Sequence, residues 1–546
     1  MRRSPGAAMM PAGGEMMHKH MNPGLLVFLR DPASYPHRPE EVREAHTHAS
    51  MVFLVPPLVY KIKKPVDFGF LDFSTLEKRR HFCQREVELN SRLAPGVYLE
   101  VESITRGKDG FAIGGDGPVA EHAVVMRHLT PDGFLDSRIR SGTAGEPELE
   151  RVARTLADFY QKQPSPPEVA EWGSVEKLRV STDENFAQTR RFIGKTLSRA
   201  AFGAIRSFTA SCYKRRRALF EKRVADGWIR DCHGDLHLDH IHVTGGELQI
   251  YDCIEFNDRF RHLDVASDAA FLAMDLDYHG RPDLARFVIR RLADLLDDPE
   301  MEELMDFYKC YRAYVRGKVE SLHSVADMAD DGERAAAAEN ARRYFQLALQ
   351  YAVCGSSPLA LVVMGRVASG KSTLATTLSH ALGWRMISSD TLRKTLAGVP
   401  PHHRGDAASR AKLYAADMTE RTYEKMIRDA AETLRRGHGV ILDATFSKRA
   451  FRDRLRATLG DGHLQWILAE ADESTAGERL RQREANHDVV SDARLGDQPM
   501  LDAAFEAPGE LPAHAVIRIA TAAKPEESLR RLLLAMSGLR ARATSP

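Results

Sequence analysis

The stretch GRVASGKS at residues 365–372 restricts the folds open to this chain more than any other feature. It fits the pattern G-x-x-x-x-G-K-[ST], whose glycines let backbone N–H groups surround phosphate at a helix N-terminus. The apolar run LALVVM before it predicts a buried strand, and TLATTLSHAL after it predicts a helix. This context predicts a nucleotide site. The residues expected to bind the nucleotide are Gly365, Arg366, Val367, Ala368, Ser369, Gly370, Lys371, Ser372 and Thr373.

A second strand end supplies a carboxylate to this site. HGVILDATF (438–446) predicts a buried strand that carries Asp443 near its end. A carboxylate at this position contacts Mg²⁺ directly or through water, and the hydroxyl of Ser372 is the expected second ligand. Lys371 is expected to reach the β- and γ-phosphates and to take part in catalysis.

The segment MISSDTLRK (386–394) predicts another strand edge, followed by two charged residues. Asp390 is placed to accept the proton of an acceptor hydroxyl, and Arg393 is placed to bind an anionic group of the substrate. Asp390 can also serve as a helix N-cap, and the two roles are compatible.

With GRVASGKS, SSDTLRK and VILDATF, residues from about 356 to 520 resemble the small P-loop kinases, a group that includes gluconate kinases, polynucleotide 5′-kinase domains and zeta-toxin-like kinases. The resemblance implies ATP and Mg²⁺ as cofactors and a parallel sheet between helices. It also implies that ERLRQRE (478–484) is a lid over the nucleotide. Arg479 and Arg483 share one helix face there, although a solvated charged helix would show the same pattern.

In the first half of the chain, HGDLHLDHIH (233–242) holds four histidines and two aspartates. A zinc site would need three or four ligands in a held geometry. The four histidines share no single face of a helix or a strand, and no cysteine array accompanies them. We therefore predict a catalytic loop in which Asp235 accepts the proton of an acceptor hydroxyl.

A kinase-type catalytic loop needs a lysine on an early strand, a glutamate on the next helix and a metal-binding aspartate on a later strand. LVYKIKKP offers Lys61, and Lys63 lies on the same strand face, so periodicity cannot separate the two. QREVELN offers Glu86, with Glu88 as the alternative. IYDCIEF places Asp252, the expected metal ligand, at the end of an apolar strand.

The HGD and YD segments, followed by RHLDVASDAAFLAMDL, resemble the aminoglycoside-phosphotransferase-like members of the protein-kinase-like fold. The resemblance implies a bilobal fold in which Asp264 and Asp268 brace the catalytic loop. His240 stands where that pattern has a metal-binding asparagine. Mg²⁺ prefers oxygen ligands, so a metal site that includes His240 and Asp252 also admits Mn²⁺.

The two halves in this order resemble bacterial bifunctional aminoglycoside phosphotransferase/ATP-binding proteins over nearly the whole chain from about residue 25. The expected fold is a multidomain α/β protein with a kinase-like part followed by a P-loop domain. We expect four parts: a disordered N-terminal segment (1–22), an N-lobe (23–130), a helical C-lobe (131–350) and a P-loop domain (356–546).

Composition limits the class of partner. There are 77 basic and 76 acidic side chains, so no overall positive field favours nucleic acid or an anionic membrane. Six cysteines without a CxxC pair fit a reducing cytoplasm, and no apolar run has the length of a membrane-spanning helix. We expect a cytoplasmic protein whose partners are ATP and a small hydroxyl-bearing acceptor; the sequence identifies no protein partner.

The leading hypothesis is a phosphotransferase with two nucleotide sites, each moving the γ-phosphoryl group of ATP to a hydroxyl. In the first alternative, the N-terminal half is a regulatory pseudokinase that binds nucleotide and controls the P-loop half; the departure at His240 supports it. In the second, the chain is a nucleic-acid 5′-end kinase, which the balanced charge disfavours. The acceptors of both sites stay open.

Overall fold

The computed structural model describes residues 21–108, 110–326, 330–400, 402, 406–485 and 494–542, except for the side chains of Ala407, Arg483 and Ala485. Contacts divide the chain into two compact units. Unit 1 comprises the described residues of Met1–Glu184, Arg217–Arg312 and Lys318–Glu339, and unit 2 those of Asn185–Arg216, Ala313–Gly317 and Asn340–Pro546.

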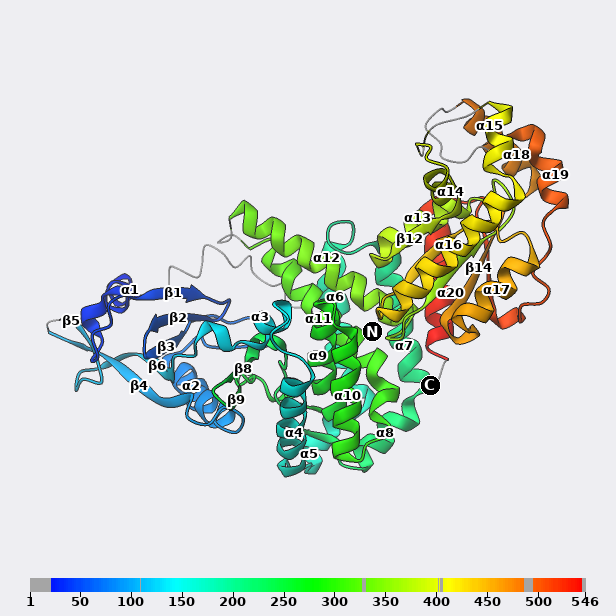
Figure 1. Cartoon of the computed structure of the whole chain (residues 1–546). Helices are drawn as coiled ribbons and strands as arrows, with labels where there is room; N and C mark the ends of the chain where they lie inside the picture. Colours follow the sequence, from blue (N-terminus) through cyan, green and yellow to red (C-terminus); the bar gives the residue numbers. More distant parts are fainter. Residues whose placement is uncertain are drawn as a thin grey trace, which may run out of the picture. The chain divides into compact units, whose positions relative to one another are not determined.

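Unit 1 begins with a six-stranded antiparallel sheet of order β1-β2-β3-β6-β4-β5, drawn in blue in Figure 1. In β3, Tyr60 and Ile62 pack on the face that also holds Leu29 of α1. The alternate residue Val59 packs with Cys83 of α2 on the opposite face, so Lys61 and Lys63 also point toward α2. The elements are α1 (Pro23–Arg30), β1 (Arg43–His46), β2 (Ser50–Val55), β3 (Leu58–Lys63), α2 (Leu76–Asn90), β4 (Tyr98–Gly107), β5 (Gly110–Ile113) and β6 (Val119–Arg127).

The rest of unit 1 is mainly helical, with two small antiparallel strand pairs, β7–β10 and β8–β9. The loop that contains HGDLHLD joins β7 to β8. The elements are α3 (Leu135–Arg140), α4 (Glu146–Lys162), α5 (Pro167–Ala170), α6 (Val175–Thr189), α8 (Arg217–Ala225), β7 (Ile229–Asp231), β8 (Ile241–Thr244), β9 (Glu247–Ile250), β10 (His262–Asp264), α9 (Val265–Tyr278), α10 (Pro282–Leu296), α11 (Met305–His323) and α12 (Asp331–Val353). Of these, α6, α11 and α12 contribute residues to both units.

Unit 2 contains a five-stranded parallel sheet of order β12-β13-β11-β14-β15. Val362 and Leu442 pack with side chains of α16 and α17, while α13 contacts β11, β12, β13 and β14, and α20 contacts β15. The elements are β11 (Ala360–Met364), α13 (Lys371–Leu382), β12 (Arg385–Ser388), α14 (Ser389–Leu396), α15 (Ala407–Leu413), α16 (Ala416–Arg435), β13 (Val440–Asp443), α17 (Arg449–Leu459), β14 (Leu464–Glu470), α18 (Glu473–Ala485), α19 (Gln498–Ala503), β15 (Val516–Ala520) and α20 (Pro525–Arg540).

This architecture confirms the predicted α/β fold class, with an antiparallel sheet and a helical part ahead of a parallel sheet between helices. The compact units differ in extent from the predicted domains. Helix α7 (Arg199–Arg215), expected in the helical C-lobe, belongs to unit 2 and packs against α20. The predicted disordered segment lies largely outside the described residues, but Met21 is buried and Asn22 caps α1.

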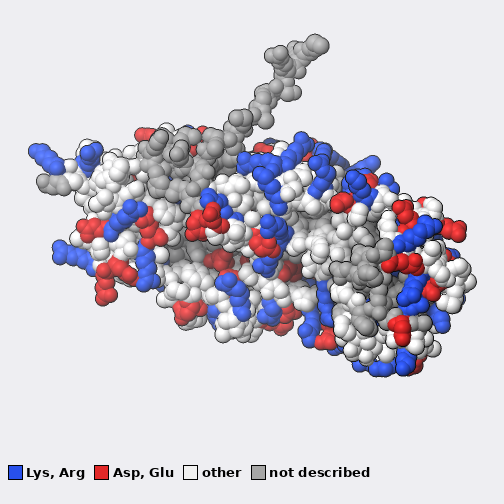
Figure 2. All heavy atoms as spheres, turned by 90° about the horizontal axis from the view of Figure 1, so that it is seen from above, with Lys and Arg blue, Asp and Glu red and all other residues white. Residues whose placement is uncertain are grey.

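Charge is mixed at the surface. On the face shown in Figure 2, basic and acidic side chains are interspersed without a large area of one sign. Among the described residues, no helix is long and apolar enough to cross a membrane.

A buried ion cluster ties α8 to the start of α9. The guanidinium of Arg223 donates to Asp264 (2.5 and 2.7 Å) and to Asp298 (2.8 Å for each of two bonds), and the Arg223 side chain is fully buried. Both carboxylates are 1% exposed. Because neither can reach water, both depend on this one cation.

We predict that Arg223→Ala lowers the free energy of unfolding of unit 1 by about 3–5 kcal/mol, because it leaves two buried carboxylates without their cation. Calorimetry of the full chain measures this as a lower transition midpoint. The matched control is Arg217→Ala on the same helix, whose side chain is 47% exposed in its ion pairs and whose loss should hardly move the midpoint. Equal midpoints for the two variants would contradict this account.

Candidate functional site

The predicted phosphate-binding loop joins the end of β11 to the first turn of α13, and residues 365–373 lie together there. Gly365 has φ 150°, and a Cβ on it would lie 2.4 Å from the carbonyl oxygen of Ala469. Gly370 has φ 83°, and a Cβ on it would lie 2.8 Å from Thr521 Oγ1. Both positions therefore require glycine. Lys371 begins the helix, so the loop N–H groups and the helix N-terminus form one region suited to an anion.

Asp443 ends β13 beside this loop, because β11 and β13 are parallel neighbours. Its side chain accepts hydrogen bonds from Ser372 and Ser388. Burial raises the pKa of Asp443, although Lys371 and Ser372 favour the ionised form. Its Oδ1 is buried and has no hydrogen-bond partner among the described residues. A buried carboxylate oxygen without a donor, next to a serine hydroxyl, fits a Mg²⁺ ligand set.

Asp390 and Arg393 lie together on α14, which follows β12. Arg393 Nη1 donates to Asp390 Oδ1 at 2.9 Å, and the guanidinium lies 4.4 Å from the centroid of the Tyr414 ring. Arg393 is 6% exposed, so Asp390 has a held, charged neighbour. The pairing brings the two predicted residues together; their roles as base and anion binder stay predictions.

Arg479 of the predicted lid lies against the phosphate-binding loop. Its Nη1 donates to the carbonyl oxygen of Ala368 (3.2 Å) and to Thr521 Oγ1 (3.0 Å), and its Nη2 donates to the carbonyl oxygen of Thr521 (2.5 Å). In this state Arg479 ties the loop to the residue after β15. The side chain of Arg483 is not among those that the structure describes, so only the contacts of Arg479 can be given.

In unit 1, Lys61, Lys63 and Glu86 form a buried ion network that sequence periodicity left unresolved. Lys61 Nζ lies 2.8 Å from Glu86 Oε1, and Lys63 Nζ lies 2.6 Å from Glu86 Oε2. Glu88, the alternative glutamate, is 66% exposed and pairs with Arg85. Glu86 is therefore the glutamate that faces both lysines.

The two lysines differ in their second partner. Lys61 Nζ lies 2.7 Å from Asp252 Oδ1, whereas Lys63 pairs with the buried Glu255. Burial opposes the charge of Lys61, but Asp252 and Glu86 raise its pKa well above the ordinary value. Likewise, burial opposes the charge of Asp252, but Lys61 holds the pKa of that carboxyl well below its ordinary range. Lys61 is thus the lysine next to the predicted metal ligand.

Two aspartates of α9 hold the loop that follows β7. Asp268 accepts the backbone N–H groups of His233 (3.0 Å) and Gly234 (2.9 Å), and Asp275 accepts that of Leu238 (2.9 Å). Asp268 thus occupies the bracing position implied by the kinase resemblance, while Asp264 binds Arg223 instead. Asp275 belongs to no recognised motif, but it follows Asp268 by seven residues, two helical turns along the same face, and this spacing is the one sequence signal for its role.

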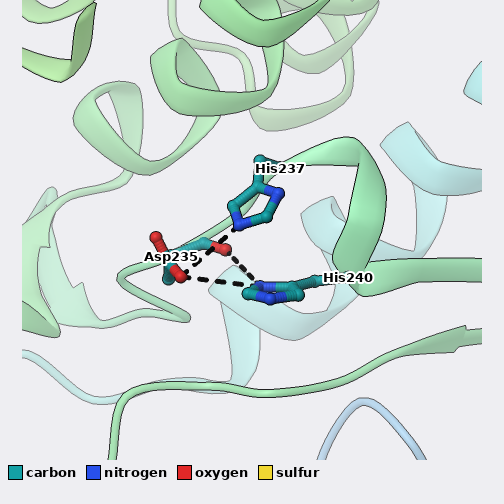
Figure 3. A group of neighbouring side chains, drawn as sticks. All are labelled: Asp235, His237 and His240. Carbon is teal, nitrogen blue, oxygen red and sulfur yellow. Dashed lines mark hydrogen bonds and ion pairs between the residues drawn. The ribbon is translucent and has the colours of Figure 1, made fainter. Parts of the chain in front are cut away.

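His237 and His240 lie beside Asp235, as Figure 3 shows. Both belong to the turn formed by the short 3-10 helix η5 (Leu238–His240) and the residue before it, and their ring centroids are 3.9 Å apart. From the spacing of a regular helix or strand, we expect the histidines of this loop to share no face. In the irregular turn, His237 and His240 nevertheless lie side by side. Burial lowers the pKa of His240 to about 4, with a smaller effect of His237, so its imidazole is neutral at pH 7.

His240 also connects the two aspartates of the site. Its Nδ1 lies 2.9 Å from the carbonyl oxygen of Asp235, and its Nε2 lies 3.4 Å from Asp252 Oδ2. A carbonyl oxygen only accepts, so Nδ1 carries the proton and Nε2 presents a lone pair to the Asp252 carboxylate. Two acceptors that face each other fit a cation between them, as the predicted metal role of His240 and Asp252 requires.

Comparison with known proteins gives matches in both parts of the chain. Residues 361–508 match the family described as an AAA domain, which confirms the predicted type of domain around the phosphate-binding loop. An uncharacterized protein of Mycobacterium tuberculosis is 36% identical over 425 residues, which cover 78% of this chain and 82% of that protein. A gluconokinase of Gluconobacter oxydans is 28% identical over 180 residues, 33% of this chain and 92% of the enzyme.

Among solved structures, a choline/ethanolamine kinase family protein from Mesorhizobium loti aligns with 60% of this chain and 99% of its own, with a TM-score of 0.33 and 13% identity. A gluconokinase from Sinorhizobium meliloti aligns with 33% of this chain and 91% of its own, with a TM-score of 0.25 and 22% identity.

We predict that Asp268→Asn destabilises unit 1 by about 1–3 kcal/mol, because an amide can accept from only one of the two backbone N–H groups and turns a donor toward the other. Chemical unfolding of the full chain measures the loss, and limited proteolysis within residues 233–240 reports the loosened loop. Asp183→Asn on α6, where the carboxylate is 62% exposed, is the control and should behave as wild type. An unchanged stability of Asp268→Asn would contradict the bracing role.

Proposed function

The chain belongs to the same family as the uncharacterized Mycobacterium tuberculosis protein, and from that premise we propose that it is a cytoplasmic ATP-dependent phosphotransferase with two nucleotide sites. Each site moves the γ-phosphoryl group of ATP to a hydroxyl of a small molecule. The observation that carries the proposal is that each unit brings a lysine and a carboxylate together, Lys61 with Glu86 and Asp252 in unit 1 and Lys371 with Asp443 beside the phosphate-binding loop in unit 2.

In the P-loop site, the loop N–H groups and Lys371 bind the β- and γ-phosphates, and Ser372 and Asp443 hold Mg²⁺, which neutralises phosphate charge. Asp390 accepts the proton of the acceptor hydroxyl, and the hydrogen bond from Arg393 keeps its carboxylate in place. The basic residue at this position favours an acceptor with an acid group. Gluconate, for which the Gluconobacter oxydans relative is named, belongs to that class.

In the N-terminal site, Lys61 binds phosphate, Asp235 accepts the hydroxyl proton, and Asp252 and His240 hold the divalent cation that neutralises phosphate charge. Glu86 and the Lys63–Glu255 pair keep Lys61 in position. The four carboxylates of Glu86, Asp235, Asp252 and Glu255 face two lysines and a neutral imidazole. The carboxylates of Asp235 and Asp252, which lie near opposite nitrogens of the His240 ring, support a divalent cation at this place.

One observation favours a second candidate for the N-terminal half. His240 offers a nitrogen where Mg²⁺ would take an oxygen, which fits a regulatory pseudokinase that binds nucleotide without transferring phosphate. Asp235 argues against this candidate, because a half that only binds nucleotide needs no base.

We predict that Lys371→Ala and Asp235→Asn each remove a separable part of phosphotransfer to small hydroxyl acceptors. Loss of the base should slow the N-terminal reaction by about 10²–10⁴-fold. Turnover of labelled ATP, with Mg²⁺ and then Mn²⁺, measures both variants and the double variant. Lys412→Ala and Asp283→Asn, on exposed helix faces, are the matched controls.

The outcomes separate the candidates. Complete loss in Lys371→Ala with no effect of Asp235→Asn would assign the N-terminal half a regulatory role. Transfer of label to the 5′-ends of RNA or DNA, in preference to small acceptors, would instead make the protein a nucleic-acid kinase.

We predict that His240→Asn, measured in the Lys371→Ala background, raises the ratio of Mg²⁺-supported to Mn²⁺-supported transfer by about tenfold or more, because an amide oxygen replaces the imidazole nitrogen. Initial rates at matched free-ion concentrations give the ratio. His279→Asn, which changes a histidine elsewhere in unit 1, should leave it unchanged. An unaltered ratio in His240→Asn would remove His240 from the metal site.

A further inference from the structure

Asp235, His237 and His240 each offer one ligand atom, and these atoms all lie within 4.8 Å of one another. His237 Nε2 is 3.5 Å and His240 Nδ1 is 3.6 Å from Asp235 Oδ2, and both nitrogens point toward that carboxylate in Figure 3. Ligands about 2.1 Å from a tetrahedral zinc ion are roughly 3.4 Å apart. These separations therefore suit a common ion.

The opposite nitrogen of each ring faces a second carboxylate. His237 Nδ1 lies 3.7 Å from Asp239 Oδ2, and His240 Nε2 lies 3.4 Å from Asp252 Oδ2. A histidine that binds a metal through one nitrogen usually donates its other N–H to a carboxylate, which orients the ring and makes the ligand more basic. Each ring therefore has a carboxylate near its opposite nitrogen, which could take up the ring N–H once an ion binds, and this is a separate observation from the spacing of the three ligand atoms.

The ligands are also held in place and accessible from one side. The side chains of His237 and His240 are 7% and 13% exposed, and Asp275 holds their turn through the N–H of Leu238. The Asp235 side chain is 32% exposed, so an ion can reach it from solvent, and water can supply a fourth ligand. Little ordering is then required when an ion binds.

We propose that Asp235, His237 and His240 form a binding site for a transition-metal ion of the zinc type, and that the bound ion inhibits the N-terminal half. The inhibition rests on the phosphotransfer proposed above, whereas the metal site does not. Imidazole nitrogen with one carboxylate suits Zn²⁺ or Co²⁺ rather than Mg²⁺.

Inhibition of the N-terminal half follows from the two ligand atoms that the ion would occupy, one on Asp235 and one on His240. The ion takes the carboxylate oxygen of Asp235, so Asp235 can no longer accept the hydroxyl proton. It also requires His240 to coordinate through Nδ1, and the ring proton then sits on Nε2 and points at Asp252. Without an ion, the 2.9 Å contact with the carbonyl oxygen of Asp235 favours the tautomer in which Nδ1 carries the proton and the Nε2 lone pair faces Asp252. The inhibitory ion and the cation of the phosphotransfer site therefore exclude each other at His240.

The first test is a titration of the full-length protein with Co²⁺, without nucleotide, followed by visible absorption, and then displacement of Co²⁺ by Zn²⁺. We expect one strong site in wild type. His237→Gln should weaken it by at least about tenfold, because one of three protein ligands is lost. Circular dichroism and the unfolding midpoint establish that the variant is folded.

His279→Asn is the matched control, since His279 lies near the carboxylates of Asp136 (3.2 Å) and Asp275 (3.8 Å) but belongs to no group with a second histidine among the described residues. It should bind Co²⁺ as wild type does. Equal Co²⁺ affinity in wild type and His237→Gln would overturn the site.

The second test measures phosphotransfer in the Lys371→Ala background at increasing Zn²⁺ and fixed Mn²⁺. We expect inhibition that added Mn²⁺ reverses, and at least about a tenfold rise in the half-inhibiting Zn²⁺ concentration when His237→Gln is added. Equal zinc sensitivity with and without His237→Gln would overturn the inhibitory role. If the Lys371→Ala protein transfers no phosphate with any ion, the proposed N-terminal activity fails, and the Co²⁺ titration still decides the metal site.

Discussion

A buried carboxylate is stable only beside a positive charge, and the arrangement of both halves of this protein depends on this requirement. Glu86 is fully buried between Lys61 and Lys63, and removing either lysine would leave charge uncompensated in a place that water cannot reach. The network joins strand β3, helix α2 and the segment after β9, so it sets the relative position of three parts of unit 1. In unit 2, Asp443 stands in a similar relation to Lys371, but with an oxygen that lacks a donor among the described residues.

Rigid backbone around these charges is the second requirement. In unit 1, Asp268 and Asp275 accept N–H groups of the loop that follows β7, so a helix positions the loop through two carboxylates. In unit 2, two glycines allow the loop to pass close to Ala469 and Thr521. Phosphotransfer relies mainly on positioning and charge stabilisation, and both frameworks serve that end by different means.

His240 links the proposed activity to the proposed inhibition. A neutral imidazole has one protonated and one free nitrogen, so it can serve only one of two neighbouring cation positions at a time. An asparagine would provide an oxygen toward Asp252 but no ligand on the Asp235 side. On the two proposals together, the departure from the kinase pattern at His240 adds control by metal ions and keeps the activity.

The sequence by itself determined the features that depend on neighbours along the chain. The phosphate-binding loop is one, because its glycines, lysine and flanking elements lie within about 20 residues, and the fold class and the AAA domain match confirm its context. The kinase-like order of Lys61, Glu86, Asp235 and Asp252 could also be predicted, because each residue follows a recognisable strand, helix or loop. Their catalytic roles stay predictions.

Only the tertiary structure decided between residues that share a period or meet across the fold. Lys61 and Lys63 point to the same face of β3, and only the position of Asp252 distinguishes them. The pairing of Asp264 with Arg223, and the inclusion of α7 in unit 2, depend on segments far apart in sequence. The approach of His237 and His240 to Asp235 depends on an irregular turn held by a distant aspartate. Periodicity describes regular helices and strands, and it carries no information on such turns or on partners brought together by folding.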